Sequence, residues 1–170
     1  MKAGLVTFYH IHHYGALLQA AATERAVERF GWDCEIIDYF VNQDNALFKR
    51  PTGLGSAAHD AHTALHYQAL SERYRRFEKF SRDHLRISDR RYGRFDELAE
   101  GPLPYDLILS GSDQIWNPYI FQDKQFDPSF LLGFVREGRR IAYAPSLGVP
   151  ALPTHRPSVF PPSRRGCRRS

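Results

Sequence analysis

Residues 107–118, LILSGSDQIWNP, place an apolar run directly before a cluster of polar and aromatic side chains. The cluster consists of Ser112, Asp113, Gln114, Trp116 and Asn117. If the apolar run is a strand, these groups lie at its carboxyl end, where open α/β sheets bind ligands. The amides can hydrogen-bond sugar hydroxyls, the indole can face a sugar ring, and backbone N–H groups can hold an anion. The alternative is a capped turn in which Trp116 is a core residue.

A second polar stretch, FYHIHHYGALLQ at residues 8–19, precedes a predicted helix. It lacks the GxGxxG pattern, so it does not predict a dinucleotide site. A helix N-terminus preceded by histidines favours an anionic group. Neighbouring histidines with no nearby carboxylate or cysteine rarely form a metal site, so we expect none. We therefore expect His13, Tyr14 and Gly15 to contact a substrate.

Other clusters are more typical of structure than of chemistry. His59, His62 and His66 share one helical face, and the basic-aromatic run 72–82 mixes charges of both signs. Both patterns indicate solvated helix faces, although a metal, a phosphate or a lipid headgroup remains an alternative. Cys34 and Cys167 lack CxxC spacing, so we expect a reducing cytoplasm, with Cys34 in the core.

The net charge of +4 depends on the last twenty residues. They contain five arginines and no acidic residue or lysine, so 18 basic residues face 19 acidic ones in residues 1–150. The body is therefore close to neutral, and we expect no nucleic-acid partner; the alternative is salt-sensitive binding through the arginine tail. No apolar run approaches the length of a transmembrane helix or a signal peptide.

The elements that must position these groups alternate between strand and helix. We predict strands near residues 3–8, 32–39, 105–109 and 139–144, helices near 14–30 and 59–85, and a helical turn after Asp127. Residues 42–58 are expected to be a loop and 88–98 irregular, with a short turn as an alternative at FDEL, residues 95–98. This pattern predicts an α/β Rossmann-like domain over residues 1–148 with a parallel sheet and flanking helices.

Residues 149–170 have repeated prolines and no apolar periodicity, so we expect a disordered tail. Their composition is that of GC-rich DNA translated out of frame. We therefore hypothesise that they are a frameshifted or truncated end of a longer protein.

Taken in order, these segments resemble the N-terminal half of the polysaccharide pyruvyl transferase family. The resemblance covers about residues 2–148 and rests on YGALLQA, FGWDCEIIDY, YDLILSGSDQIWNP, DPSFLLGFV and RIAYAPSLG. One departure is His13, at a position where the family commonly has Asn. The family's second half, with its Arg/His motif, has no counterpart here.

The resemblance implies a GT-B-like enzyme of two Rossmann-like domains. It transfers a pyruvyl group from phosphoenolpyruvate, its donor substrate, to a sugar of a bacterial polysaccharide, without a further cofactor. An acceptor carried on a lipid would bring the protein to the membrane surface. Within this picture Asp113 is the candidate base, and Ser146 joins the substrate-binding residues. We expect the chain to be inactive alone; the alternative is a non-catalytic remnant or a module that pairs with a separately encoded second half.

Overall fold

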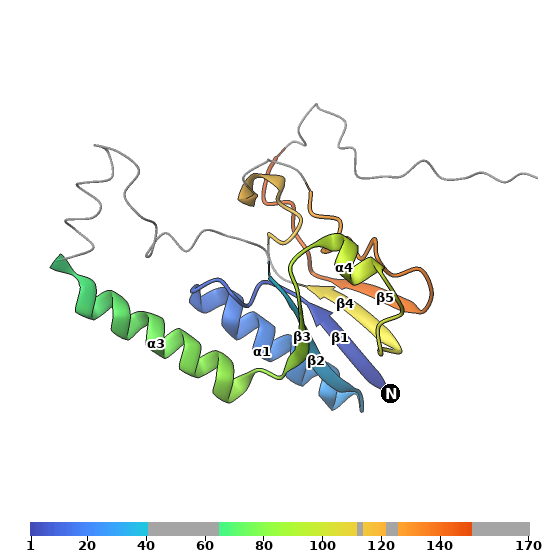
Figure 1. Ribbon diagram of the computed structural model, residues 1–170, viewed down its shortest axis with the longest axis horizontal. Helices are drawn as coiled ribbons and strands as arrows, with labels where there is room; N and C mark the ends of the chain where they lie inside the picture. Colours follow the sequence, from blue (N-terminus) through green and yellow to red (C-terminus); the bar gives the residue numbers. More distant parts are fainter. Residues whose placement is uncertain (41–64, 112–113, 122–125, 151–170) are drawn as a thin grey trace, which may run out of the picture.

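The computed structural model describes residues 1–40, 65–111, 114–121 and 126–150, which form a parallel sheet with helices on both faces (Figure 1). The strands are β1 (Lys2–Val6), β2 (Asp33–Tyr39), β3 (Ile87–Tyr92), β4 (Leu107–Gly111) and β5 (Arg139–Tyr143). The helices are α1 (Tyr14–Arg29), α3 (Tyr67–His84), α4 (Phe95–Ala99) and the short 3-10 helix η2 (Pro118–Ile120). Within these ranges, none of the helices has both the length and the apolar character that a bilayer span requires.

The strand order is β3-β2-β1-β4-β5, and every pairing is parallel. The chain therefore runs outward from β1 to β3 on one side and then returns to place β4 and β5 on the other. This is the order of a doubly wound Rossmann-like sheet, with its topological switch point between β1 and β4. The predicted α/β class is confirmed, as is the parallel β1–α1–β2 unit.

Helices α1 and α3 cover one face of the sheet. Leu17 and Ala20 of α1 and Phe77 of α3 are buried against Leu5 and Ile36 of the sheet, in one apolar cluster. Helix α1 ends at Arg29, and Gly31, with a φ of +83°, takes the left-handed position after the helix cap, where glycine has no Cβ to clash. Cys34 belongs to the same cluster and is fully buried, as predicted.

Helix α4 and the turns of residues 126–135 cover the opposite face. Leu98 and Phe130 are almost fully buried there against Val6, Ile37 and Ile108. The helical turn predicted after Asp127 is a succession of tight turns, in which the Gly133 N–H donates to the Pro128 carbonyl. This segment closes the second core because its aromatic and aliphatic side chains face the sheet.

The prediction of an irregular segment was wrong for residues 88–92, which belong to β3, whereas the helical turn expected at FDEL (residues 95–98) lies in α4. Because of β3, the sheet has one strand more than predicted. The sequence of β3, ISDRRY, has no apolar run because most of its side chains are half-buried or exposed at the sheet edge. Its backbone pairing with β2, rather than side-chain burial, makes it a strand.

Strand β5 is the other edge of the sheet, and all five of its residues are exposed. Ile141 and Tyr143 keep 49% and 59% of their surface accessible.

Helix α3 begins at Tyr67, within the helix predicted from residue 59. The start of that prediction, the loop at 42–58 and nearly all of the predicted tail lie outside the described residues.

Candidate functional site

The turns that follow β1 and β4 leave the sheet side by side. Val6 is paired with Ser110 near the carboxyl ends of the two strands. The histidine-rich turn and α1 therefore begin beside the segment that contains Gln114 and Trp116. This juxtaposition lies at the switch point, where a crevice opens in sheets of this order. Ser112 and Asp113, which were expected to belong to it, lie outside the described residues.

Asn117 organises the turn after β4. Its Nδ2 donates to Gln114 Oε1 at 2.9 Å, and its Oδ1 accepts the Tyr119 N–H at 3.0 Å. The second bond caps η2, and the side chain is buried. The amides of Gln114 and Asn117 are thus joined to each other, with Gln114 on the exposed side of the pair.

Trp116 holds this turn against the second core. Its Nε1–H donates to the Phe130 carbonyl at 3.0 Å, and the Ser110 hydroxyl donates to the same carbonyl at 2.6 Å. The indole is half-buried and packs against the cluster that contains Phe130. These contacts match the capped-turn alternative for Trp116 and Asn117, and a contact with a ligand stays a prediction for both.

Ser146 joins the turn after β5 to the turn after β4. The Trp116 N–H donates to the Ser146 carbonyl at 3.2 Å. The Ser146 hydroxyl accepts the Gly148 N–H at 3.0 Å, and Gly148 lies against the Gln114 side chain. The structure therefore brings Gln114, Trp116, Asn117 and Ser146 into one group.

His13, Tyr14 and Gly15 are exposed at the start of α1. The Tyr14 ring, 66% exposed, lies 4.7 Å from that of Phe77 on α3. The His13 side chain makes no capping hydrogen bond, and the first turn of α1 has no acidic residue. The helix N-terminus consequently keeps its positive character at the carboxyl edge of the sheet.

The two preceding histidines, His12 and His10, contact different carboxylates. His12 Nε2 lies 3.0 Å from Glu78 Oε1, and its ring stacks on Phe77 at 5.3 Å. His10 instead turns toward Asp38 on β2, at 3.0 Å. Among the described residues, no three His, Cys, Asp or Glu side chains form a group that could hold a metal ion.

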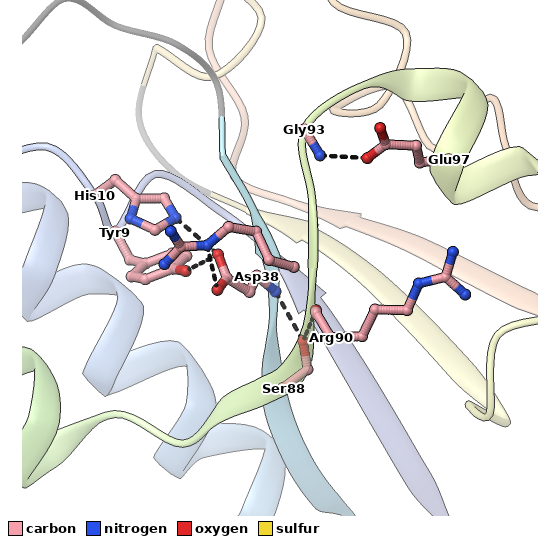
Figure 2. Close-up of polar contacts among 8 residues, drawn as sticks. Tyr9, His10, Asp38, Ser88, Arg90, Gly93 and Glu97 are labelled. Atoms are coloured by element: carbon pink, nitrogen blue, oxygen red, sulfur yellow. Dashed lines mark hydrogen bonds and ion pairs between the residues drawn. The ribbon is translucent and has the colours of Figure 1, made fainter.

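Asp38 is the centre of a buried polar cluster that the sequence did not predict. Its Oδ1 accepts the Tyr9 hydroxyl at 2.5 Å and lies 3.0 Å from His10 Nε2, while its Oδ2 accepts Arg91 Nε at 3.0 Å. Figure 2 shows Tyr9 and His10 both pointing toward Asp38. The Asp38 N–H also meets the Ser88 hydroxyl at 2.9 Å. The loop after β1 is thereby tied to both β2 and β3.

Burial sets the protonation of the two ring side chains in this cluster. It raises the pKa of Tyr9 far above its usual value, and the hydrogen bond to Asp38 adds to the shift. Burial also lowers the pKa of His10, although Asp38 partly opposes this. His10 is therefore a neutral imidazole at neutral pH. The one signal in the sequence was Asp38 itself, a charged residue inside the apolar strand segment EIIDY.

No protein-family model, no curated protein and no solved structure matches this chain significantly.

Proposed function

We propose that this chain is the acceptor-side Rossmann-like domain of a pyruvyl transferase-like protein with a GT-B-like arrangement. Its reaction would join the pyruvyl group of phosphoenolpyruvate to a sugar as a ketal, releasing phosphate. The observation that carries the proposal is the adjacency of β1 and β4. It brings the start of YGALLQA near the described part of the segment after β4, from Gln114 on, and both segments carry the resemblance to that family.

The side chains at the carboxyl edge of the sheet suit such ligands. Gln114 offers an exposed amide, and Tyr14 offers an exposed ring and hydroxyl for a sugar. The N-terminus of α1, with no acidic residue in its first turn, suits a carboxylate or a phosphate. A sugar acceptor bound here would therefore lie within reach of an anionic donor.

The direct test is transfer of labelled pyruvate from phosphoenolpyruvate to a panel of pyranoside acceptors by the full chain. Calorimetric titration with the same sugars measures acceptor binding separately from transfer. We expect Gln114→Ala and Tyr14→Ala to weaken sugar binding about tenfold each, since each removes one to two hydrogen bonds or a ring contact. Tyr67→Ala removes a comparably exposed aromatic residue at the start of α3 and should leave binding unchanged. Absence of both transfer and sugar binding would refute the proposal.

The second candidate is a non-catalytic module that acts with a separately encoded partner. The exposure of β5 favours it, because a strand of an α/β sheet is ordinarily covered on its faces. A module of this kind would bind the sugar but would transfer no pyruvate. The same two measurements therefore separate the candidates.

A further inference from the structure

Asp38 fixes which nitrogen of His10 carries the proton. A carboxylate can only accept, so the contact of 3.0 Å requires the proton on Nε2 of the neutral ring. The lone pair then lies on Nδ1. In Figure 2 the second ring nitrogen points away from Asp38. The arrangement is that of a histidine–aspartate dyad, in which the carboxylate orients the imidazole and the opposite nitrogen is a base.

The surroundings hold the ring in this orientation. Its centroid lies 3.7 Å from that of the Tyr9 ring, which is tilted by 39° to it, and it makes an edge contact with the Phe40 ring at 4.8 Å. The His10 side chain is 23% exposed and that of Asp38 is 9% exposed, so solvent reaches the imidazole but hardly the carboxylate. A buried orienting acid and a partly open imidazole are what a general base requires.

We infer that Nδ1 of His10 is the proton acceptor for the attacking sugar hydroxyl, with Asp38 and Tyr9 as positioning residues. This inference rests on the proposed function and names a base within the described residues, where the sequence suggested Asp113. His10 lies in the connection from β1 to α1, which leads to Tyr14 at the start of the helix, at the carboxyl edge of the sheet.

The proton balance of the reaction shows which proton His10 would transfer. Ketal formation makes two C–O bonds at C2 of the enolpyruvyl group and breaks the C2–O bond to phosphate. Of the two sugar hydroxyl protons, one ends on the methylene carbon, which becomes a methyl group, and the other leaves with the phosphate. His10 takes this second proton from the attacking hydroxyl and passes it to the departing phosphate, returning to its neutral form.

The pH dependence follows from the groups that face the ring. These are Asp38 of β2, Arg91 of β3, Glu78 of α3 and the neighbouring Tyr9. Burial and Arg91 lower the pKa of His10 from 6.5, and the two carboxylates raise it, with burial dominant. A protonated imidazole cannot accept a proton, so transfer should decline only as the pH falls below 6.5.

His10→Gln is the decisive variant, because Gln Nε2 can still donate to Asp38 but cannot act as a base. We expect transfer to fall about 10²–10⁴-fold and the acid limb of the pH profile to disappear, with sugar affinity and melting temperature unchanged. His84→Gln, an exposed histidine at the end of α3, is the control and should keep the wild-type rate and profile. A wild-type rate in His10→Gln would overturn the inference while leaving the proposed function intact.

A second measurement tests the role of His10 even if the chain alone transfers no pyruvate, and its result does not depend on whether the proposed function is correct. Long-range ¹H–¹⁵N correlation spectra of the full chain report the tautomer of each histidine. We expect a neutral His10 with its proton on Nε2 at pH 7. A proton on Nδ1, or a doubly protonated ring at pH 7, would overturn the inference.

Discussion

Gln114 packs so closely against Gly148 that a Cβ at Gly148 would lie 2.6 Å from the Gln114 side chain. Gly148 also has a φ of +63°, in the left-handed region that other residues rarely adopt. The turn after β5 therefore fixes the position of an amide on the turn after β4. The turns after β4 and β5 are therefore held together as one unit at the carboxyl edge of the sheet.

We predict that Gly148→Ala destabilises the protein by about 1–3 kcal/mol and weakens sugar binding, because it strains the backbone and displaces Gln114. Urea denaturation and calorimetry measure the two effects. Gly31→Ala is a matched control with φ of +83° and no atom within 4 Å of the added Cβ. It should lose stability but keep sugar affinity. Equal affinity in both variants would contradict the role given to Gly148.

Removing the Tyr9 hydroxyl should destabilise the folded protein. Tyr9→Phe deletes a hydrogen bond to a buried carboxylate, for which we expect a loss of about 1.5–3 kcal/mol in the free energy of unfolding. Chemical denaturation measures it. Tyr119→Phe, at a side chain that is 52% exposed, should change stability by less than about 0.5 kcal/mol. A Tyr9→Phe variant as stable as the wild type would show that Asp38 needs no partner at this position.

Ser110 and Trp116 should be energetically coupled through the carbonyl of Phe130, which accepts hydrogen bonds from both. Ser110→Ala or Trp116→Phe alone leaves this carbonyl with one donor, whereas the double variant leaves none among the partners described. We therefore expect the double variant to lose about 1 kcal/mol more than the two single variants together. Strict additivity in a double-mutant cycle would contradict this prediction.

Glu24 should make stability depend on pH. It is 3% exposed, and burial raises its pKa from 4.5 to about 7, although its Oε1 accepts the Arg86 N–H at 3.0 Å. The folded state thus holds a proton more tightly than the unfolded state does. The stability that this group contributes is complete below pH 4.5 and is lost as the pH rises toward 7, by about 3 kcal/mol.

Glu24→Gln should remove this loss and make the protein more stable than wild type at pH 8. Melting temperatures between pH 4.5 and 8 measure the effect. Glu100→Gln, at an exposed position, should keep the wild-type pH dependence. If Glu24→Gln and the wild type decline in parallel, another group causes the decline.

The sequence predicted the elements with strong local signals. Apolar runs marked β1, β2 and β4, and helical spacing that ends at Gly31 marked α1. Strand β3 was missed because a polar edge strand is stabilised by backbone pairing with β2, about 50 residues earlier in the chain. Strand order could not be predicted for the same reason, since pairing between distant segments leaves no local pattern.

The candidate site was likewise predictable from the sequence only in part. The segment after β4 was identified because its unusual side chains are adjacent in the sequence. The cluster around Asp38 was not, because its members lie 28 residues (His10), 29 residues (Tyr9) and 53 residues (Arg91) from the aspartate. Only the fold brings them together. Asp38, a carboxylate within an apolar strand, was a visible anomaly. A buried carboxylate needs a hydrogen-bonding or charged partner, but the sequence does not show which residues those partners are.

The central place of β1 has a consequence for how the protein is made. This strand is synthesised well before one of its two neighbours, β4, which begins at Leu107. Until that point has left the ribosome, one side of β1 has no partner and its apolar residues remain uncovered. Parallel sheets with such distant pairings fold slowly. We therefore expect the nascent chain to need a chaperone until β4 emerges, and the core to close only after that point.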